Sequence, residues 1–170
     1  MDQDGLIINT QKEYQFLKEK ILEKVKNKII LNKLICLFKV IDKYNFLENS
    51  IFFEDSYSEV DLVFFQKNTE DSGKVIINIR SKYSKYYVYG CKFYANNRET
   101  ENIDQFCCFA EKILCGNYLI EKGIYLDKLY SFKVIIDKDE GIIKYGNPFT
   151  KINKKNISYS RMKGLNLLTN

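Results

Sequence analysis

The chain has 170 residues, a hydrophobic fraction of 45% and a net charge of +5, which fits one globular domain and excludes disorder throughout. Histidine is absent, which excludes histidine acid–base catalysis, Ser-His and Cys-His nucleophile pairs, and histidine metal sites. Residues with A/T-rich codons dominate, as is typical of an AT-rich microbe or its mobile elements and viruses, so part of the lysine excess reflects codon bias.

Helical patterns open the chain. Thr10 followed by Glu13 has the pattern of a capping box, and apolar residues then recur at helical spacing. A second helical segment, Leu31–Phe46, is apolar nearly all round, which is typical of a helix buried on more than one side. Asn27 and Asn32 are weak points, and the pattern leaves open whether the chain forms one bent helix or two.

From residue 51 the apolar residues recur at period two, which predicts strands joined by short connections and therefore paired antiparallel. A further helix is expected between Asn102 as N-cap and Gly116, with Phe106, Ala110 and Ile113 in its buried stripe. The predicted strands are Ile51–Phe53, Glu59–Gln66, Lys74–Arg80, Tyr86–Tyr94, Phe132–Ile136 and Ile142–Tyr145. This order predicts an α+β fold in which N-terminal helices and one central helix pack on a mostly antiparallel sheet.

The predicted organisation is a single α+β domain over residues 1–150 and a basic, loosely held C-terminal tail over residues 151–170. Five cysteines without metal spacing indicate buried free thiols in a reducing compartment. The N-terminus lacks a signal-peptide pattern, and the most apolar run, Ile29–Ile41, is too short and too charged to cross a membrane. We therefore expect a cytoplasmic protein with no cofactor, no metal and no membrane partner.

One predicted hairpin places polar residues among strong β-formers. Because side chains alternate along a strand, Glu59 and Asp61 share one face of the first strand, as do Asn78 and Arg80 of the second. Over about residues 10–82 this pattern resembles the restriction-endonuclease-like superfamily, in which an Asp and an acid-x-Lys on adjacent strands bind a metal and orient water. The resemblance implies a metal-dependent nuclease centred on Asp61.

Two of the three motif positions depart from that family. Asn78 stands at the second acid and is a weaker, neutral metal ligand. Arg80 stands at the lysine, and an arginine cannot act as a base near neutral pH. These departures indicate an inactivated nuclease-like fold or, more simply, a sheet whose polar face is solvated, unless Glu59 serves as the second carboxylate.

A second candidate site is the segment 80–94, which interleaves tyrosines with cations and contains no acid. Such a surface can stack bases and hold phosphates, and it equally fits a protein interface. The simpler interpretation is that half of these residues pack in the core and the others form a solvated basic face. The predicted partner-binding residues are Arg80, Lys82, Tyr83, Lys85, Tyr87, Tyr89 and Lys92.

Charge is separated along the chain. Residues 51–73 carry six carboxylates and one lysine, whereas residues 74–98 carry six cations and no acid. We expect a non-enzymatic, basic binding protein that inhibits or modulates a nucleic-acid-handling protein or nucleoprotein. Direct nucleic-acid binding, and a metal-dependent nuclease that is active or inactivated, are the alternatives.

Overall fold

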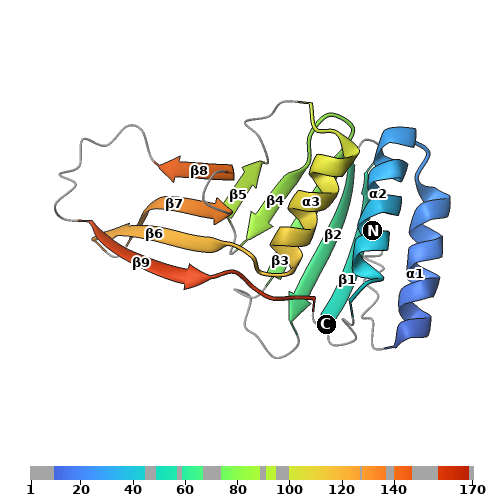
Figure 1. Ribbon diagram of the computed structural model, residues 1–170, viewed down its shortest axis with the longest axis horizontal. Helices are drawn as coiled ribbons and strands as arrows, with labels where there is room; N and C mark the ends of the chain where they lie inside the picture. The colour runs from blue at the N-terminus through green and yellow to red at the C-terminus, as the bar shows by residue number, and fades with distance from the viewer. Residues whose placement is uncertain are drawn as a thin grey trace.

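The computed structural model describes residues 10–44, 49–56, 59–66, 74–88, 91–94, 100–126, 128–136, 140–146 and 157–168. Within these ranges, three helices and two antiparallel sheets confirm the α+β class, although the strands form two sheets where one was expected (Figure 1). The elements are α1 Gln11–Lys24, α2 Lys28–Ile41, β1 Asn49–Ser56, β2 Glu59–Gln66, β3 Lys74–Arg80, β4 Lys85–Val88, β5 Cys91–Tyr94, α3 Ile103–Leu114, β6 Leu119–Tyr125, β7 Lys128–Ile136, β8 Glu140–Gly146 and β9 Ser158–Lys163.

The N-terminal helices are separate. The Thr10 hydroxyl accepts a hydrogen bond from Glu13 N, and the Glu13 carboxylate accepts one from Thr10 N, so the predicted capping box is confirmed. The side chain of Asn27 caps α2, and α2 ends at Ile41, five residues before the predicted end, because apolar spacing alone does not mark where the chain turns towards β1. No helix in the described part of the chain is long and apolar enough to span a membrane.

The five-stranded sheet has the order β1-β2-β3-β4-β5. Alternate side chains of its strands point to one face, where Leu62, Ile77 and Tyr86 are completely buried. Figure 1 shows α2 and α3 over one face of this sheet, with α1 outside α2. Below, "inner face" means the face that carries Leu62, Ile77 and Tyr86, and "outer face" means the opposite face.

The predicted single strand Tyr86–Tyr94 is a hairpin instead. Its arms are β4 and β5, with Tyr87 opposite Lys92 and Val88 opposite Cys91. Strand β4 ends at Val88 and β5, which begins at Cys91, pairs antiparallel with it, so the chain reverses direction inside a segment that β-forming residues alone do not divide. As a result, Lys92 returns to a position beside Tyr87.

The second sheet has the order β8-β7-β6-β9, and it extends beyond the first sheet, away from α1 (Figure 1). Its buried side chains, which include Ile120, Phe132 and Val134, belong to the same hydrophobic core. Strand β9 lies within the segment for which composition indicates a loose tail. There, pairing with β6 and the burial of Leu167 and Leu168 build residues 157–168 into the fold.

Helix α3 packs its apolar stripe into the hydrophobic core. Phe106, Ala110 and Ile113 are completely buried, so the predicted core role of this stripe is confirmed. Cys36 of α2 and Cys107 of α3 form a disulfide, so the prediction of free thiols is wrong for this pair. The two residues are 71 positions apart, and sequence spacing gives no indication that helix packing brings them together.

Candidate binding surface on the five-stranded sheet

Strand register assembles the outer face from two rows of opposed residues. The first row runs Asp61, Asn78, Lys85 and Tyr94. The second row runs Val63, Ile76, Tyr87 and Lys92. Acidic residues of β2 therefore share one surface with cations and tyrosines of β4 and β5.

The four residues of the nuclease-like interpretation lie together on this face. Arg80 forms an ion pair with Glu59, and its Nε also donates to Asn78 Oδ1 at 3.0 Å. Asn78 Nδ2 in turn donates to the carboxylate of Asp61. The chain of contacts thus runs from Glu59 through Arg80 and Asn78 to Asp61.

These contacts determine what the polar cluster can do. The Arg80 guanidinium neutralises Glu59, and the Asn78 amide occupies one oxygen of Asp61, so both carboxylates already interact with protein donors. No group of three or more cysteine, aspartate or glutamate side chains in the described ranges is arranged to hold a metal ion. Asn78 is buried and Glu59, Asp61 and Arg80 are half-buried, so the cluster is a partly buried, ion-paired network within the outer face.

Of the predicted partner-binding residues that the structure describes, three lie on β4 and β5 and three lie at the connection between β3 and β4. Lys85, Tyr87 and Lys92 project from the outer face. Tyr83 packs edge-to-face on Tyr94, with ring centroids 5.4 Å apart. Tyr89 lies outside the described residues.

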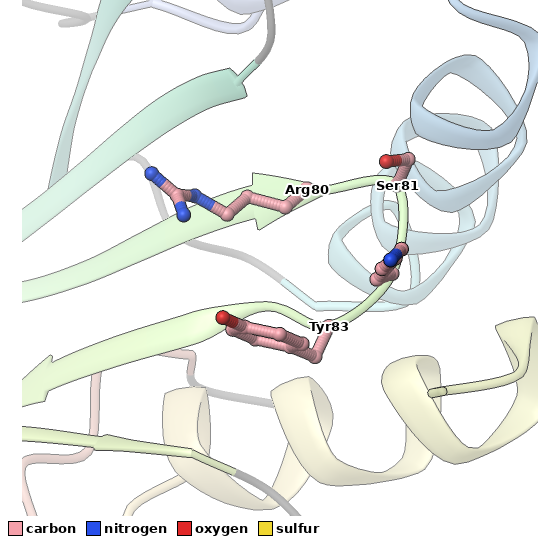
Figure 2. Close-up of a pocket in the computed structure, with 4 residues that line it drawn as sticks. Arg80, Ser81 and Tyr83 are labelled. Atoms are coloured by element: carbon pink, nitrogen blue, oxygen red, sulfur yellow. The ribbon is translucent and has the colours of Figure 1, made fainter. Parts of the chain in front are cut away.

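Arg80, Lys82 and Tyr83, together with Ser81, line a pocket of about 220 Å³ at the connection between β3 and β4. Figure 2 shows the side chains of Arg80 and Tyr83 extending to the same side of this connection. Lys82 is exposed, whereas Arg80 and Tyr83 are half-buried. Below, this feature is called the Arg80–Tyr83 pocket.

Behind the pocket lies a buried ion pair that sequence patterns did not reveal. Lys33 Nζ is 2.9 Å from Glu101 Oε2, and the side chains are only 0% and 4% exposed. The same ammonium group donates to the backbone oxygen of Arg80 at 2.9 Å. Lys33 stands three residues after Ile30 and four before Leu37, so its place in the apolar stripe of α2 was an available signal of burial.

Glu101 is the centre of this buried network. Besides Lys33, its carboxylate accepts hydrogen bonds from Ser84 N at 3.1 Å and from the Tyr86 hydroxyl at 3.4 Å. Burial, and then the nearby Glu101 charge and its hydrogen bond, raise the pKa of Tyr86 well above its ordinary value. Tyr86 is therefore a neutral donor that helps to hold Glu101 in place.

The free thiols of Cys108 and Cys115 have different settings. Burial raises the pKa of the Cys115 thiol, which keeps it protonated near neutral pH. Cys108 is exposed on α3, and nucleophilic catalysis would require a positioned base beside it. No protein-family model, curated protein or solved structure matches this chain, so the physical properties of the outer face are what point to a function.

Proposed function

We propose that this is a non-enzymatic binding protein whose outer face engages another protein. The observation that carries the proposal is the combination of opposite charges on one surface, with Asp61 and Glu59 on β2 and Lys85 and Lys92 on β4 and β5. A phosphate backbone is uniformly negative and would meet the Asp61 carboxylate unfavourably, because Arg80 is paired with Glu59 and Asp61 contacts the neutral amide of Asn78. A protein surface with both signs of charge complements such a face.

The tyrosines supply the contact area. Tyr83, Tyr87 and Tyr94 are half-buried, so each shows part of its ring beside the cations. Tyrosine is enriched at interfaces because its rigid ring adds contact area at small entropic cost, and its hydroxyl group offers a hydrogen bond. The Tyr83–Tyr94 contact further restricts both rings before binding.

The polar cluster supports binding over hydrolysis. A metal-dependent phosphodiesterase needs carboxylates open to a divalent ion, whereas Glu59 is paired with Arg80 and Asp61 is bonded to Asn78. We propose that the partner is a nucleic-acid-handling protein, because such proteins present basic surface at their nucleic-acid site and acidic surface elsewhere. Occupation of that site would inhibit or modulate the partner.

Direct binding of single-stranded nucleic acid is the second candidate. The Tyr83–Tyr94 pair lies beside Lys85, and Lys82 is exposed at the same end of the face. Aromatic rings with adjacent cations bind single strands by stacking and phosphate contact.

Affinity purification from the native host, followed by oligonucleotide titration, separates these functions. The control Lys26→Glu/Lys39→Glu changes an exposed residue between α1 and α2 and an exposed residue of α2, so wild-type protein and this control are expected to retain the same protein partner. Lys85→Glu/Lys92→Glu is expected to lose it. Equal retention by both variants would exclude the outer face, and salt-sensitive oligonucleotide binding without a protein partner would favour the second candidate.

Hydrolysis is tested directly with DNA, RNA and cyclic nucleotides in Mg²⁺ and Mn²⁺. We expect no turnover. Turnover that disappears in a folded Asp61→Ala variant would replace the binding proposal with the nuclease interpretation.

A further inference from the structure

We infer that the Arg80–Tyr83 pocket is a preformed site for one anionic oxygen group, a carboxylate or a phosphate. The inference rests on the proposed function in one respect, because the partner protein is the molecule that would carry this anionic group. The pocket lies at the end of the outer face, where β3 passes into β4. A group bound there would anchor one end of the interface.

The pocket has unused hydrogen-bond donors. Arg80 contacts Glu59 and Asn78 through Nε and Nη2, and its Nη1 makes no hydrogen bond to any described residue. Lys82 is exposed, with no carboxylate of a described residue within 4 Å. The guanidinium group of Arg80, the ammonium group of Lys82 and the hydroxyl groups of Ser81 and Tyr83 are donors of the kind that bind carboxylate and phosphate oxygens.

Glu59 lowers the net positive charge of the pocket and orients Arg80. It holds the guanidinium of Arg80 by one edge, so the group is oriented before any ligand arrives. Glu59, Arg80 and Lys82 together carry a single net positive charge, which complements a singly charged anion. A pocket of about 220 Å³ is smaller than the usual site for a drug-sized ligand and is large enough for a carboxylate or a phosphate group.

The pocket backbone is fixed from inside the molecule. Lys33 Nζ bonds to the oxygen of Arg80, and Glu101 N bonds to the oxygen of Lys82 at 2.9 Å. Ser84 N bonds to the carboxylate of Glu101. Because these bonds already order the connection, ligand binding would cost little conformational entropy.

The test is an NMR titration of the ¹⁵N-labelled full chain with inorganic phosphate and with acetate, each compared with chloride at matched ionic strength. We expect saturable amide shifts confined to residues 80–84 and their neighbours. Lys82→Gln, which removes an exposed charge, should weaken the affinity several-fold, whereas the control Lys39→Gln should leave it unchanged. Arg80→Gln should weaken it further, with the fold checked by the unchanged amide spectrum of α1.

The two anions distinguish the sources of the group. Saturation by acetate indicates a carboxylate from an acidic protein side chain, and saturation by phosphate alone indicates a phosphoryl group on the partner. Shifts equal to those in chloride, or equal in wild type and Lys82→Gln, would overturn the inference. Because the titration needs no partner, its failure leaves the purification result standing, and a saturable anion site without any retained partner would contradict only the proposed function.

Discussion

The ammonium group of Lys33 is completely removed from solvent, and transfer of a charge out of water carries a large desolvation cost. Glu101 and the Arg80 carbonyl compensate for that cost, as does the Phe106 ring, whose centroid lies 5.4 Å from the ammonium group. A buried pair of this kind contributes little net stability compared with apolar residues. Its main effect is geometric, since it joins α2, the β3–β4 connection and the segment before α3.

Replacement of Lys33 by methionine should lower the free energy of unfolding by about 3–5 kcal/mol, because Glu101 would remain buried without its cation. Urea denaturation measures the change. Lys39→Met, on the exposed side of the same helix, is the control and should have little effect. Adding Glu101→Gln to Lys33→Met should recover part of the loss, and a double variant no more stable than Lys33→Met would contradict this account.

The raised pKa of Tyr86 predicts how the free energy of unfolding depends on pH. Its pKa is raised in the folded protein, so the folded state keeps the proton where the unfolded state, with a pKa of about 10, releases it. The stabilisation is complete below the unfolded pKa and decreases as pH rises from there towards the raised pKa of the folded state, by about 1.4 kcal/mol per pH unit for one tyrosine. Urea denaturation at successive alkaline pH values should show a shallower decline for Tyr86→Phe, and equal slopes would exclude Tyr86 as a cause.

Sequence patterns predicted some residue positions and missed others for a physical reason. Period-two alternation is local, so the shared outer position of Lys85 and Tyr87 follows from it directly. The Lys33–Glu101 pair joins residues 68 positions apart, and hydropathy treats both as surface residues. Only the packing of α2 against the sheet reveals that they meet.

Among the elements, predictions worked where burial alternates and failed where it does not. Strand β2 alternates half-buried and buried residues from Glu59 to Phe64 and was predicted with its correct bounds. Strand β9 is mostly exposed, and strand β6 contains two adjacent charged residues, so neither shows a clear alternation. Their pairing with each other spans about 40 positions and follows from tertiary structure, not from local preference.

The chain segment after β9 caps the C-terminal end of helix α3. The backbone N–H groups of Leu167 and Leu168 both donate to the Leu114 carbonyl, one of the carbonyls that a helix end leaves unpaired. The side chains of both leucines are buried in the common core. The segment therefore attaches to the C-terminal end of α3 and to the hydrophobic core.

Leu167→Ala tests this docking. The Leu167 side chain is completely buried, so the substitution should cost about 2–5 kcal/mol through lost burial and the cavity that remains. Leu119→Ala is the matched control, because Leu119 is 41% exposed and should cost much less. Thermal and urea unfolding measure both, and equal losses would show that the segment after β9 is only loosely attached.

At the scale of the whole molecule, the α+β class followed from the sequence because the helical and period-two segments are long and distinct. The division into two sheets did not, because it depends on which edges pair. Glu59 and Asp61 of the acidic block and Lys85 and Lys92 of the basic block lie on opposite sides of the outer face, since β2, β3, β4 and β5 pair in chain order. Antiparallel pairing in chain order therefore places acidic and basic residues that are separate in the sequence on one surface.

This charge layout predicts how binding kinetics respond to mutation. Lys82→Glu/Lys85→Glu reverses the charge of exposed Lys82 and of half-buried Lys85 near the Arg80–Tyr83 pocket, and charges that solvent reaches mainly steer the encounter between proteins. The variant should slow association with the purified partner more than it speeds dissociation, as surface plasmon resonance can measure. The difference from wild type should shrink as salt shortens the screening length from about 10 Å towards about 3 Å. Lys26→Glu/Lys39→Glu carries the same change in net charge away from the face and should preserve the wild-type association rate, whereas equal slowing in both variants would show that net charge, not this surface, drives the encounter.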